Sequence, residues 1–276
     1  FGISAIKALL MLNLFEKALA ELPTQNNGVF LQENLAWEYT MIYAWRAASH
    51  KNLFGFPHAT VRFWDLRRFF DVRSYSQQKL ALPRPDFVAV SGDLNKNAYL
   101  KGNYPLNELV DIEALRYLYL ESLSIKFQQS KTPIKGPFRM LVLGDYLSAN
   151  TNLQMNFLRV VAGELANIEL TVKPHPACPI DALDYPELKF KLTTKPLSDL
   201  LEKFDIAYTS NSTSAVVDAF SAGLKVISVL DPADLNLSPL RGISGVRFIS
   251  SAKELGDALG EAALQHGDEV KRFKYF

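Results

Sequence analysis

Two short strings in the second half of the sequence carry the groups best suited to bind an anion. The first is Lys173-Pro174-His175-Pro176, and the second is Ser210-Asn211-Ser212-Thr213-Ser214. Each follows an apolar run that predicts a buried strand, and parallel strands present their ligand-binding groups at their carboxyl ends. A helix that begins among hydroxyl side chains also offers free N–H groups and the positive end of its dipole to an anion. An imidazole combined with a hydroxyl-rich helix start therefore predicts a phosphate-binding site.

Each string also has a simpler interpretation. His175 can be a turn histidine, although the prolines on both sides fix the backbone as a pre-positioned binding group requires. Serine and threonine are ordinary helix N-caps, but one hydroxyl suffices for capping and the second string has four. Lys173 adds a cation two residues before His175, on the same side of the strand. Asp218 lies one helical turn beyond the string, where it either orients a hydroxyl, binds a ribose or is a solvated surface carboxylate.

Gly144 follows the first predicted strand of the second half, so either its backbone approaches a ligand or it forms a simple turn. The sequence has no G-x-G-x-x-G dinucleotide motif, no Walker A loop and no G-x-S-x-G elbow. No Cys/His cluster has zinc spacing, and no Asp-x-Asp stands at a strand end to hold a metal–nucleotide pair. We therefore expect neither a metal nor a cofactor besides a nucleotide-bearing substrate.

The first half contains two candidates for a general base, Glu33 and His58. Each follows a predicted strand, at 29–32 and 53–56, so both side chains are expected at strand ends. Either group can remove a proton from an acceptor hydroxyl, with helix capping for Glu33 and a structural turn for His58 as the simpler alternatives. Arg62, Asp65 and Arg67-Arg68 follow closely, and Arg62 and Asp65 are the candidates for contacts with the acceptor. All three arginines are candidates for binding an anionic sugar or phosphate, which arginine binds well. Solvated helix charges are the alternative for these residues.

The elements that position these residues alternate between strands and helices. Strands are predicted at 29–32, 53–56, 86–90, 139–143, 168–172, 188–192, 205–209, 226–230 and 246–249. Helices are predicted at 3–22, 35–49, 63–70, 110–123, 152–165, 196–204, from the hydroxyl string to Gly223, and at 252–266. The polar stretch at 124–137, with two prolines, predicts a linker. The fold class expected is thus α/β, with two Rossmann-like βα domains, at 1–123 and 138–276, facing across a cleft that binds the ligand.

Length and composition limit the classes of protein that the chain can belong to. Its 276 residues, 48% hydrophobic and 21% charged, suit a globular protein of two domains. A net charge of +1 gives no general electrostatic case for binding to nucleic acid or to an anionic membrane.

The single cysteine, Cys178, fits a reducing compartment, and no segment approaches the roughly 20 apolar residues of a membrane span. We expect a cytoplasmic protein with at most peripheral association at the inner face of the membrane. The sequence begins at Phe1 rather than methionine, which leaves open what precedes it.

The two strings together resemble the donor site of GT-B glycosyltransferases. The similar families are bacterial sialyltransferases, capsule Kdo transferases and the CDP-glycerol glycerophosphotransferases of teichoic-acid synthesis. In these families the His-Pro histidine and the hydroxyl cluster contact the donor phosphate, which here implies His175 and Ser212-Thr213-Ser214, about 35 residues further on. The strings at 32–38 and 55–65 look like a family of proteins for the biosynthesis of surface carbohydrates such as capsule and O-antigen.

The resemblance implies a metal-independent glycosyltransferase that moves a sugar from a nucleotide-activated donor to a glycan or lipid-linked acceptor. His175, Lys173 and the start of the helix would stabilise the leaving phosphate. The acidic-acidic-glycine string of typical bacterial sialyltransferases is not found, which leaves the base open between His58 and Glu33. His58 resembles the N-domain histidine of the glycerophosphotransferases, which favours it. A nucleotide-sugar epimerase of the same fold and a non-catalytic nucleotide-sugar or glycan-binding module are the alternatives.

Overall fold

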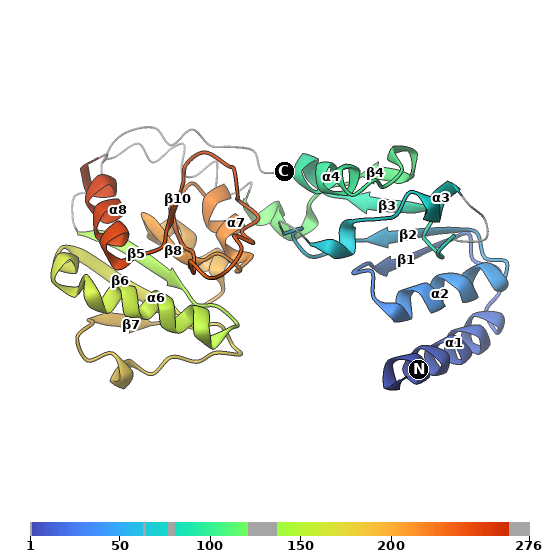
Figure 1. The fold of residues 1–276 in the computed structure, drawn as a ribbon, viewed down its shortest axis with the longest axis horizontal. Coiled ribbons are helices and arrows are strands. Elements are labelled where there is room, and N and C mark those ends of the chain that lie inside the picture. The colour runs from blue at the N-terminus through green and yellow to red at the C-terminus, as the bar shows by residue number, and fades with distance from the viewer. Residues whose placement is uncertain (1, 63–64, 77–80, 121–136, 265–276) are drawn as a thin grey trace. The chain divides into compact units, whose positions relative to one another are not determined.

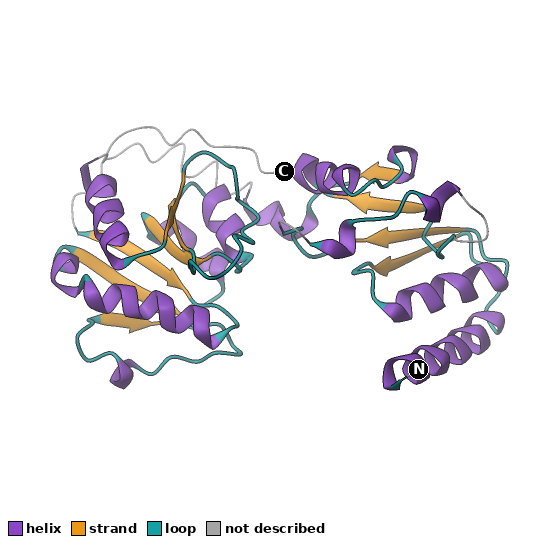
Figure 2. Ribbon diagram, in the orientation of Figure 1, coloured by secondary structure: helices purple, strands orange, loops and turns teal. Residues whose placement is uncertain are grey.

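A computed structural model of the chain describes residues 2–62, 65–76, 81–120 and 137–264. The chain divides into two compact units, Phe1–Ala114 (unit 1) and Leu115–Tyr275 (unit 2), and each is described by itself. Both units alternate parallel strands with helices (Figures 1 and 2), which confirms the predicted α/β class with two Rossmann-like domains. The linker predicted at 124–137 lies outside the described residues except for its last one.

Unit 1 contains a four-stranded parallel sheet with the order β1-β2-β3-β4. Its strands are β1 (Asn27–Leu31), β2 (Asn52–Phe56), β3 (Phe87–Val90) and β4 (Leu109–Asp111), and its α-helices are α1 (Ile3–Ala20), α2 (Ala36–Ala47), α3 (Arg73–Ser76) and α4 (Gly92–Lys101). Leu53 and Phe30 of the sheet pack with Trp45 of α2, and Phe15 of α1 joins this cluster. Burial of these apolar side chains holds the first two strands beneath α2, and so fixes where both strands end.

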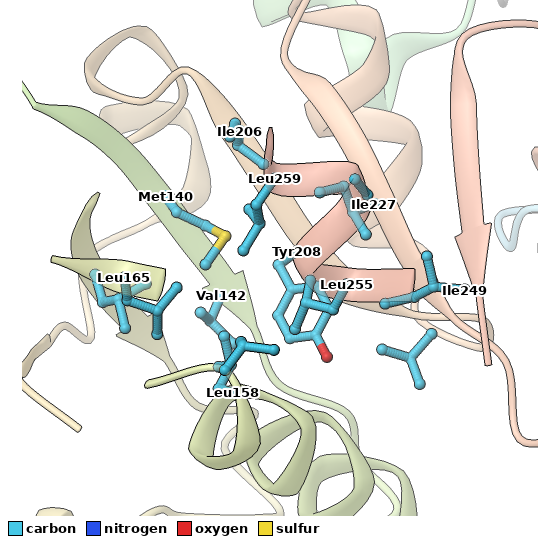
Figure 3. Packing of buried hydrophobic residues seen from close by; sticks show 14 of the residues in the cluster. Met140, Val142, Leu158, Leu165, Ile206, Tyr208, Ile227, Ile249, Leu255 and Leu259 are labelled. Carbon is cyan, nitrogen blue, oxygen red and sulfur yellow. The ribbon is translucent and has the colours of Figure 1, made fainter. Parts of the chain in front are cut away.

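Unit 2 contains a six-stranded parallel sheet with the order β10-β9-β8-β5-β6-β7. Its strands are β5 (Phe138–Leu143), β6 (Ile168–Lys173), β7 (Phe190–Leu192), β8 (Ile206–Ser210), β9 (Lys225–Val229) and β10 (Val246–Ile249). Among its described residues, the longer α-helices are α6 (Ser148–Val160), α7 (Ala215–Ser221) and α8 (Ala252–Leu264). Counted from β5, this is the 3-2-1-4-5-6 order of a dinucleotide-binding fold. Figure 3 shows the core, in which Met140 and Tyr208 of the central strands pack with Leu158 of α6 and Leu255 of α8.

Several predicted helices are wrong, for local and tertiary reasons. Leu66–Arg68 forms only a 3-10 turn, which the Asp65 side chain caps, and residues 63–64 lie outside the described ones. The first residues of the helix predicted at 110–123 belong to strand β4 instead, because Val110 pairs with Ala89 of β3. Residues 115–120 are helical, first as a 3-10 turn, and 121–123 lie outside the described residues. The stretch at 196–204 contains two 3-10 turns, Leu197–Asp199 and Leu201–Lys203. Helix α4 was not predicted, since it is largely polar and buries only Asn95 and Tyr99.

Candidate functional site

The two anion-binding strings meet at the carboxyl edge of the unit 2 sheet. Strand β5 pairs with β6 on one side and with β8 on the other. The His175 string follows β6 and the hydroxyl string follows β8, so the two strings flank the end of β5 although about 35 residues separate them in sequence. The strand order reverses between β5 and β8, and open parallel sheets bind ligands at such a switch point.

Asp145, the second residue after β5, is the residue to which the hydroxyl string binds. Its side chain is fully buried and accepts hydrogen bonds from the hydroxyls of Ser210 and Ser212. The backbone N–H of Leu147 donates to its Oδ1 at 2.9 Å, and the side-chain amide of Asn150 donates to its Oδ2 at 3.3 Å. Burial by itself would raise the pKa of Asp145, but these donors stabilise the carboxylate and lower its pKa below the ordinary value.

This arrangement divides the hydroxyl string into an inner and an outer half. A hydroxyl has one proton to donate, and Ser210 and Ser212 both donate theirs to Asp145. Asn211 is also buried, and its side-chain amide donates to the carbonyl oxygen of Leu235 at 3.0 Å. Thr213 and Ser214 lie further out and are half-buried. The inner residues therefore build the turn, and the outer two retain the capacity to donate to a ligand.

One ring nitrogen of His175 already has a hydrogen-bond partner within the turn. Its Nδ1 accepts a hydrogen bond from the backbone N–H of Ala177 at 3.1 Å, which leaves Nε2 as the protonated nitrogen of the neutral ring. The ring also lies edge-on to Tyr146, with 6.2 Å between the ring centroids. The tight turn adds a hydrogen bond of 2.9 Å from the N–H of Cys178 to the carbonyl of His175. The half-buried imidazole can thus donate from Nε2 to an anion at this edge of the sheet.

The remaining predicted residues beside His175 have structural contacts of their own. A Cβ added to Gly144 would lie 3.2 Å from the backbone nitrogen of His175, so glycine allows the ends of β5 and β6 to approach. The ammonium group of Lys173 donates to the carbonyl oxygen of Lys195 at 2.8 Å. Because an ammonium group has three protons, Lys173 can still donate to a second partner.

Asp218 on α7 is a structural carboxylate. It is buried, so its interpretation as a solvated surface group is wrong. The Tyr119 hydroxyl donates a hydrogen bond to Oδ1 of Asp218. Burial raises the pKa of both side chains, and the hydrogen bond from Tyr119 partly offsets the rise for Asp218. The pair joins the segment around Tyr119 to the helix that follows the hydroxyl string.

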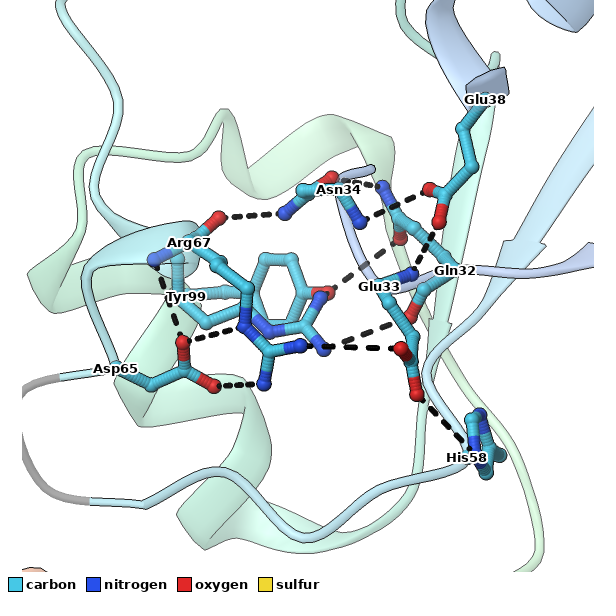
Figure 4. A network of polar contacts seen from close by, with 9 residues as sticks. Gln32, Glu33, Asn34, Glu38, His58, Asp65, Arg67 and Tyr99 are labelled. Carbon is cyan, nitrogen blue, oxygen red and sulfur yellow. Dashed lines mark hydrogen bonds and ion pairs between the residues drawn. The ribbon is translucent and has the colours of Figure 1, made fainter. Parts of the chain in front are cut away.

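Unit 1 brings its two predicted bases together at the carboxyl ends of β1 and β2 (Figure 4). Nε2 of His58 lies 3.3 Å from Oε1 of Glu33. Nη1 of Arg67 lies 3.8 Å from the other carboxylate oxygen of Glu33, and its Nε and Nη2 both bind Asp65 at 2.8 Å. Burial would raise the pKa of Asp65, but the hydrogen bonds and charge of Arg67 lower it. His58, Glu33, Arg67 and Asp65 thus form a continuous chain of charged and polar groups.

The backbone around Glu33 is fixed by the next helix. Oε1 of Glu38, on α2, accepts from the N–H of Glu33 at 2.8 Å, and Oε2 accepts from the N–H of Asn34 at 2.9 Å. Asn34 has a φ of 59°, in the left-handed region that asparagine tolerates better than most residues. The N-cap position of α2 is Leu35, so Glu33 does not cap this helix and its carboxylate is directed to His58 and Arg67 instead.

A buried arginine, Arg68, lies next to this cluster and contacts the residues beside it. Arg68 donates a hydrogen bond to the Tyr99 hydroxyl, and its Nη2 donates to the carbonyl oxygen of Gln32 at 3.4 Å. Its guanidinium lies 5.1 Å from the centroid of the Tyr99 ring, within the range of a cation–π interaction. Burial raises the pKa of Tyr99. Arg62, the other predicted acceptor contact, is half-buried.

The sequence analysis assigned no role to two residues that build these sites, Asp145 and Glu38, and it proposed Arg67 as a ligand contact rather than as a partner of Glu33 and Asp65. Asp145 and Glu38 are acids close to a strand end, a placement that could have indicated a role in organising a turn. Within the described residues, no group of three or more His, Cys, Asp or Glu side chains is arranged to hold a metal ion. In that same part of the chain, no helix is sufficiently long and apolar to cross a bilayer.

Comparisons with known proteins identify the fold. No family model matches the sequence, and no curated protein matches it significantly. Among solved structures, one from Listeria monocytogenes assigned as a UDP-N-acetylglucosamine 2-epimerase has a TM-score of 0.60 at 14% identity, over 100% of this chain and 76% of that chain. The UDP-GlcNAc 2-epimerase of Neisseria meningitidis, solved with UDP-GlcNAc, has a TM-score of 0.59 at 12% identity, over 96% and 74% of the two chains.

Glycosyltransferases have the same fold. The α,α-trehalose 6-phosphate synthase of Burkholderia multivorans matches with a TM-score of 0.55 at 12% identity, over 96% of this chain and 70% of that chain. Anabaena HepE, solved with UDP and glucose, matches with a TM-score of 0.50 at 11% identity, over 96% and 74%. At such identities the likeness concerns the fold alone. The chain has the GT-B-type fold of two Rossmann-like domains that nucleotide-sugar epimerases and glycosyltransferases share.

Proposed function

We propose that the chain is a glycosyltransferase that takes its sugar from a nucleotide-activated donor. The observation that carries the proposal is the placement of His175 and the outer hydroxyls on the two sides of the β5 end. There, the Nε2 proton of His175 and the hydroxyls of Thr213 and Ser214 are available to an anion. Solved proteins of this fold were crystallised with UDP, UDP-glucose or UDP-GlcNAc, which supports a nucleotide sugar as the ligand.

In this proposal, unit 2 binds the donor phosphates. His175 and Lys173 stabilise the negative charge that develops on the leaving phosphate, and Thr213 and Ser214 add hydroxyl donors. Ser210, Asn211 and Ser212 act indirectly, because their donor groups already bind Asp145 and Leu235. They hold the turn in one conformation, so that the outer donors are in place before the reaction begins. No metal ion or other cofactor has a step in this proposal.

Unit 1 deprotonates the acceptor. Since Nε2 of His58 faces the Glu33 carboxylate, Nδ1 is the nitrogen that accepts the proton of the acceptor hydroxyl. Glu33 orients the ring and stabilises the imidazolium that forms, while Arg67, which Asp65 holds in place, contacts Glu33. The acceptor oxygen then bonds to the anomeric carbon, and the bond from that carbon to the phosphate oxygen breaks. Both predicted bases thus have a role, with His58 as the base and Glu33 as its positioning residue, and Arg62 is kept as an acceptor contact.

The pathway is part of the same proposal. The resemblance of the strings at 32–38 and 55–65 supports an acceptor that is a glycan or a lipid-linked saccharide of a bacterial surface polysaccharide, such as capsule or lipopolysaccharide. Such a reaction would take place in the cytoplasm, with the protein at most peripherally associated with the inner face of the membrane.

A nucleotide-sugar epimerase is the second candidate. The TM-scores of 0.60 and 0.59 to the two epimerases exceed the 0.55 to the trehalose 6-phosphate synthase, which favours this alternative. An epimerase forms product without an acceptor, whereas a transferase requires one. A non-catalytic binding module is the third candidate, and it would bind the donor equally well after loss of both His58 and Glu33 while turning over none.

A donor screen tests the proposal. Thermal shifts with CMP-, CDP-, UDP- and GDP-linked sugars should identify one class that raises the melting temperature, because a ligand of the folded state stabilises it. His175→Ala should weaken binding of that donor and slow its turnover, whereas Leu183→Ala at a strongly exposed position of unit 2 should change neither. If His175→Ala left turnover unchanged, the role of His175 would be wrong. Product formed without an acceptor would replace the transferase with an epimerase.

A further inference from the structure

A groove runs along helix α2 of unit 1 and widens toward the end of the helix. Its walls are α2, with Ile42 and Arg46, and the segment at 82–86. The wide part, which we call the α2 groove, has a volume of about 330 Å³. This volume lies within the range of roughly 300–1,000 Å³ that pockets for small ligands have. Toward Asn34 and Glu38 the space narrows to about 20 Å³, the volume of about one water molecule, so a larger ligand fits only in the wide part.

The α2 groove lies away from the cluster of His58 and Glu33. Asp86, one of its lining residues, directly precedes β3, which places the groove at the amino edge of the sheet. His58 and Glu33 follow β2 and β1, and the strands of unit 1 are parallel (Figure 1), so these two residues lie at the opposite edge. The rise of an α-helix also puts about 12 Å of α2 between Arg46 of the groove and Glu38, which binds the backbone N–H of Glu33. The groove is therefore a candidate site of its own.

Two ion pairs line the α2 groove and balance each other's charges. Nη2 of Arg46 lies 2.7 Å from Oδ1 of Asp86. Arg84 is bound twice to Glu108, since its Nε and Nη2 donate to the two carboxylate oxygens at 2.8 Å and 2.7 Å. An anion bound here would lie close to both carboxylates, whose repulsion offsets the attraction of the arginines. The charges of the groove therefore favour a neutral ligand.

The same side chains offer hydrogen-bond donors and acceptors next to an apolar surface. Arg46 and Asp86 have exposed fractions of 43% and 28%, so a ligand can reach both. A guanidinium has more N–H donors than one ion pair uses, and a carboxylate oxygen accepts more than one hydrogen bond. A matching ligand therefore combines groups that both donate and accept with an apolar face. The apolar lining residues are Ile42, Leu82, Pro83 and Pro85.

We propose that the α2 groove binds a neutral sugar unit of a glycan. Sugar hydroxyls both donate and accept hydrogen bonds, as the ion pairs require, and the C–H faces of a sugar ring pack on apolar side chains. That this glycan is the acceptor rests on the proposed function. Because the groove and His58 lie at opposite edges of the sheet, only an acceptor of several sugar units reaches both. The groove would thus select a longer glycan over a monosaccharide.

Binding to an array of neutral bacterial oligosaccharides, followed by calorimetric titration, tests the groove without a donor and without turnover. The wild-type chain should bind at least one class of these oligosaccharides. Arg46→Gln should weaken that binding by about tenfold or more, because hydrogen bonds from a charged group are lost. Arg159→Gln is the matched control, since Arg159 has the same exposed fraction of 43% in an ion pair of unit 2, and it should leave binding unchanged.

A second variant fills the groove and keeps both ion pairs. Leu82 is 55% exposed, so Leu82→Trp adds a bulky ring to the wall of the groove without disturbing a core. It should also weaken glycan binding by about tenfold or more, whereas Leu183→Trp, at an exposed position of unit 2, should not. Both groove variants should melt within about 2 °C of the wild type, as at exposed positions, which shows that they fold.

The outcomes separate the groove from the proposed reaction. A folded chain that binds no neutral oligosaccharide, or that binds equally well in Arg46→Gln and Leu82→Trp, would overturn the proposal. Binding of inorganic phosphate that Arg46→Gln abolishes would also overturn it, because the ligand would then be an anion. Glycan binding that both variants weaken, in a chain that turns over no nucleotide sugar, would support the groove and contradict the transferase. Glycosyl transfer by a chain that binds no glycan in the groove would do the reverse.

Discussion

The candidate sites of the two units use charge in opposite ways. In unit 1, Glu33 forms an ion pair with Arg67 and lies 3.3 Å from Nε2 of His58, while all three side chains remain partly exposed to solvent. In unit 2, the single carboxylate of Asp145 is fully buried and is bound by hydroxyl, amide and backbone donors. The first cluster has groups that can still exchange a proton with a ligand. The second has its acid fully committed to the conformation of a turn.

The difference separates residues that take part in the proposed reaction from residues that stabilise the conformation of the site. Exposed ion pairs contribute about 0–1 kcal/mol each to stability, because water solvates the separated charges almost as well. A buried carboxylate without its donors would cost several kcal/mol. We therefore expect substitutions in the unit 1 cluster to change activity at nearly constant stability. Substitutions around Asp145 should change stability first, and donor binding as a consequence.

Loss of the proposed base should give the largest effect. His58→Ala should lower kcat/KM for glycosyl transfer by about 10²–10⁴-fold, the range of general base catalysis. The free energy of unfolding should change by no more than about 0.5 kcal/mol, as for a substitution of an exposed residue. Steady-state kinetics with saturating donor, together with urea unfolding, measure the two quantities on the same protein.

A matched control separates this role from a general effect of charge. The exposed ion pair between Arg159 and Glu187 in unit 2 has an N–O distance of 3.0 Å and a comparable exposure. Glu187→Gln should leave both activity and stability unchanged, whereas Glu33→Gln should lower kcat because His58 loses its orienting partner. If His58→Ala lowered stability and left kcat/KM intact, the unit 1 cluster would be structural and the comparison would fail.

Removal of the buried carboxylate should give the next largest effect. Asp145→Ala should lower the free energy of unfolding by about 3 kcal/mol, because it leaves the donors of Ser210, Ser212 and Leu147 without an acceptor. Asp184→Ala, at an exposed acid of the same unit, is the control and should change it by no more than about 0.5 kcal/mol. Equal effects of the two substitutions would show that Asp145 does not organise the turn.

The stabilisation by Asp145 should depend on pH in one direction. Its pKa is lower in the folded protein than the value of about 3.9 for an unperturbed aspartate. A carboxyl group with a lowered pKa stabilises the folded state fully above its unfolded pKa, and this contribution is lost as the pH falls through the folded pKa. The difference in unfolding free energy between the wild type and Asp145→Asn should therefore be constant near neutral pH and shrink below about pH 4. A difference that grows on acidification would contradict the assignment.

The sequence predicted the strands better than the helices, because a buried parallel strand leaves a continuous apolar run. The runs at 139–143 and 205–209 are of this kind, and both are strands in the centre of the unit 2 sheet. Strand β4 has three residues and exists because it pairs with β3, a long-range contact that local pattern does not contain. Helix α4 is largely polar, so its period is hidden in the sequence.

The site was predictable as far as each residue depends on its own strand. Glu33, His58, His175 and Ser210 were assigned to strand ends from the runs that precede them, and all four follow strands or end one. The contact of Glu33 with His58 depends in addition on the pairing of β1 with β2. The binding of Ser210 to Asp145 depends on β8 lying beside β5, which the sequence does not specify. Strand order therefore decides which strand-end groups meet.

The smallest effects should appear within the hydroxyl string, where the comparison of the two units is repeated on a smaller scale. Ser212→Ala removes a buried hydrogen bond to Asp145 and should lower the free energy of unfolding by about 1 kcal/mol. Ser214→Ala should leave stability unchanged and weaken binding of the nucleotide-sugar donor by less than about tenfold, the value of one hydrogen bond. Urea unfolding and calorimetric titration with the donor found in the screen distinguish the two variants. A reversal, with Ser212→Ala affecting binding alone and Ser214→Ala affecting stability alone, would show that the inner hydroxyls face the ligand and the outer ones hold the turn.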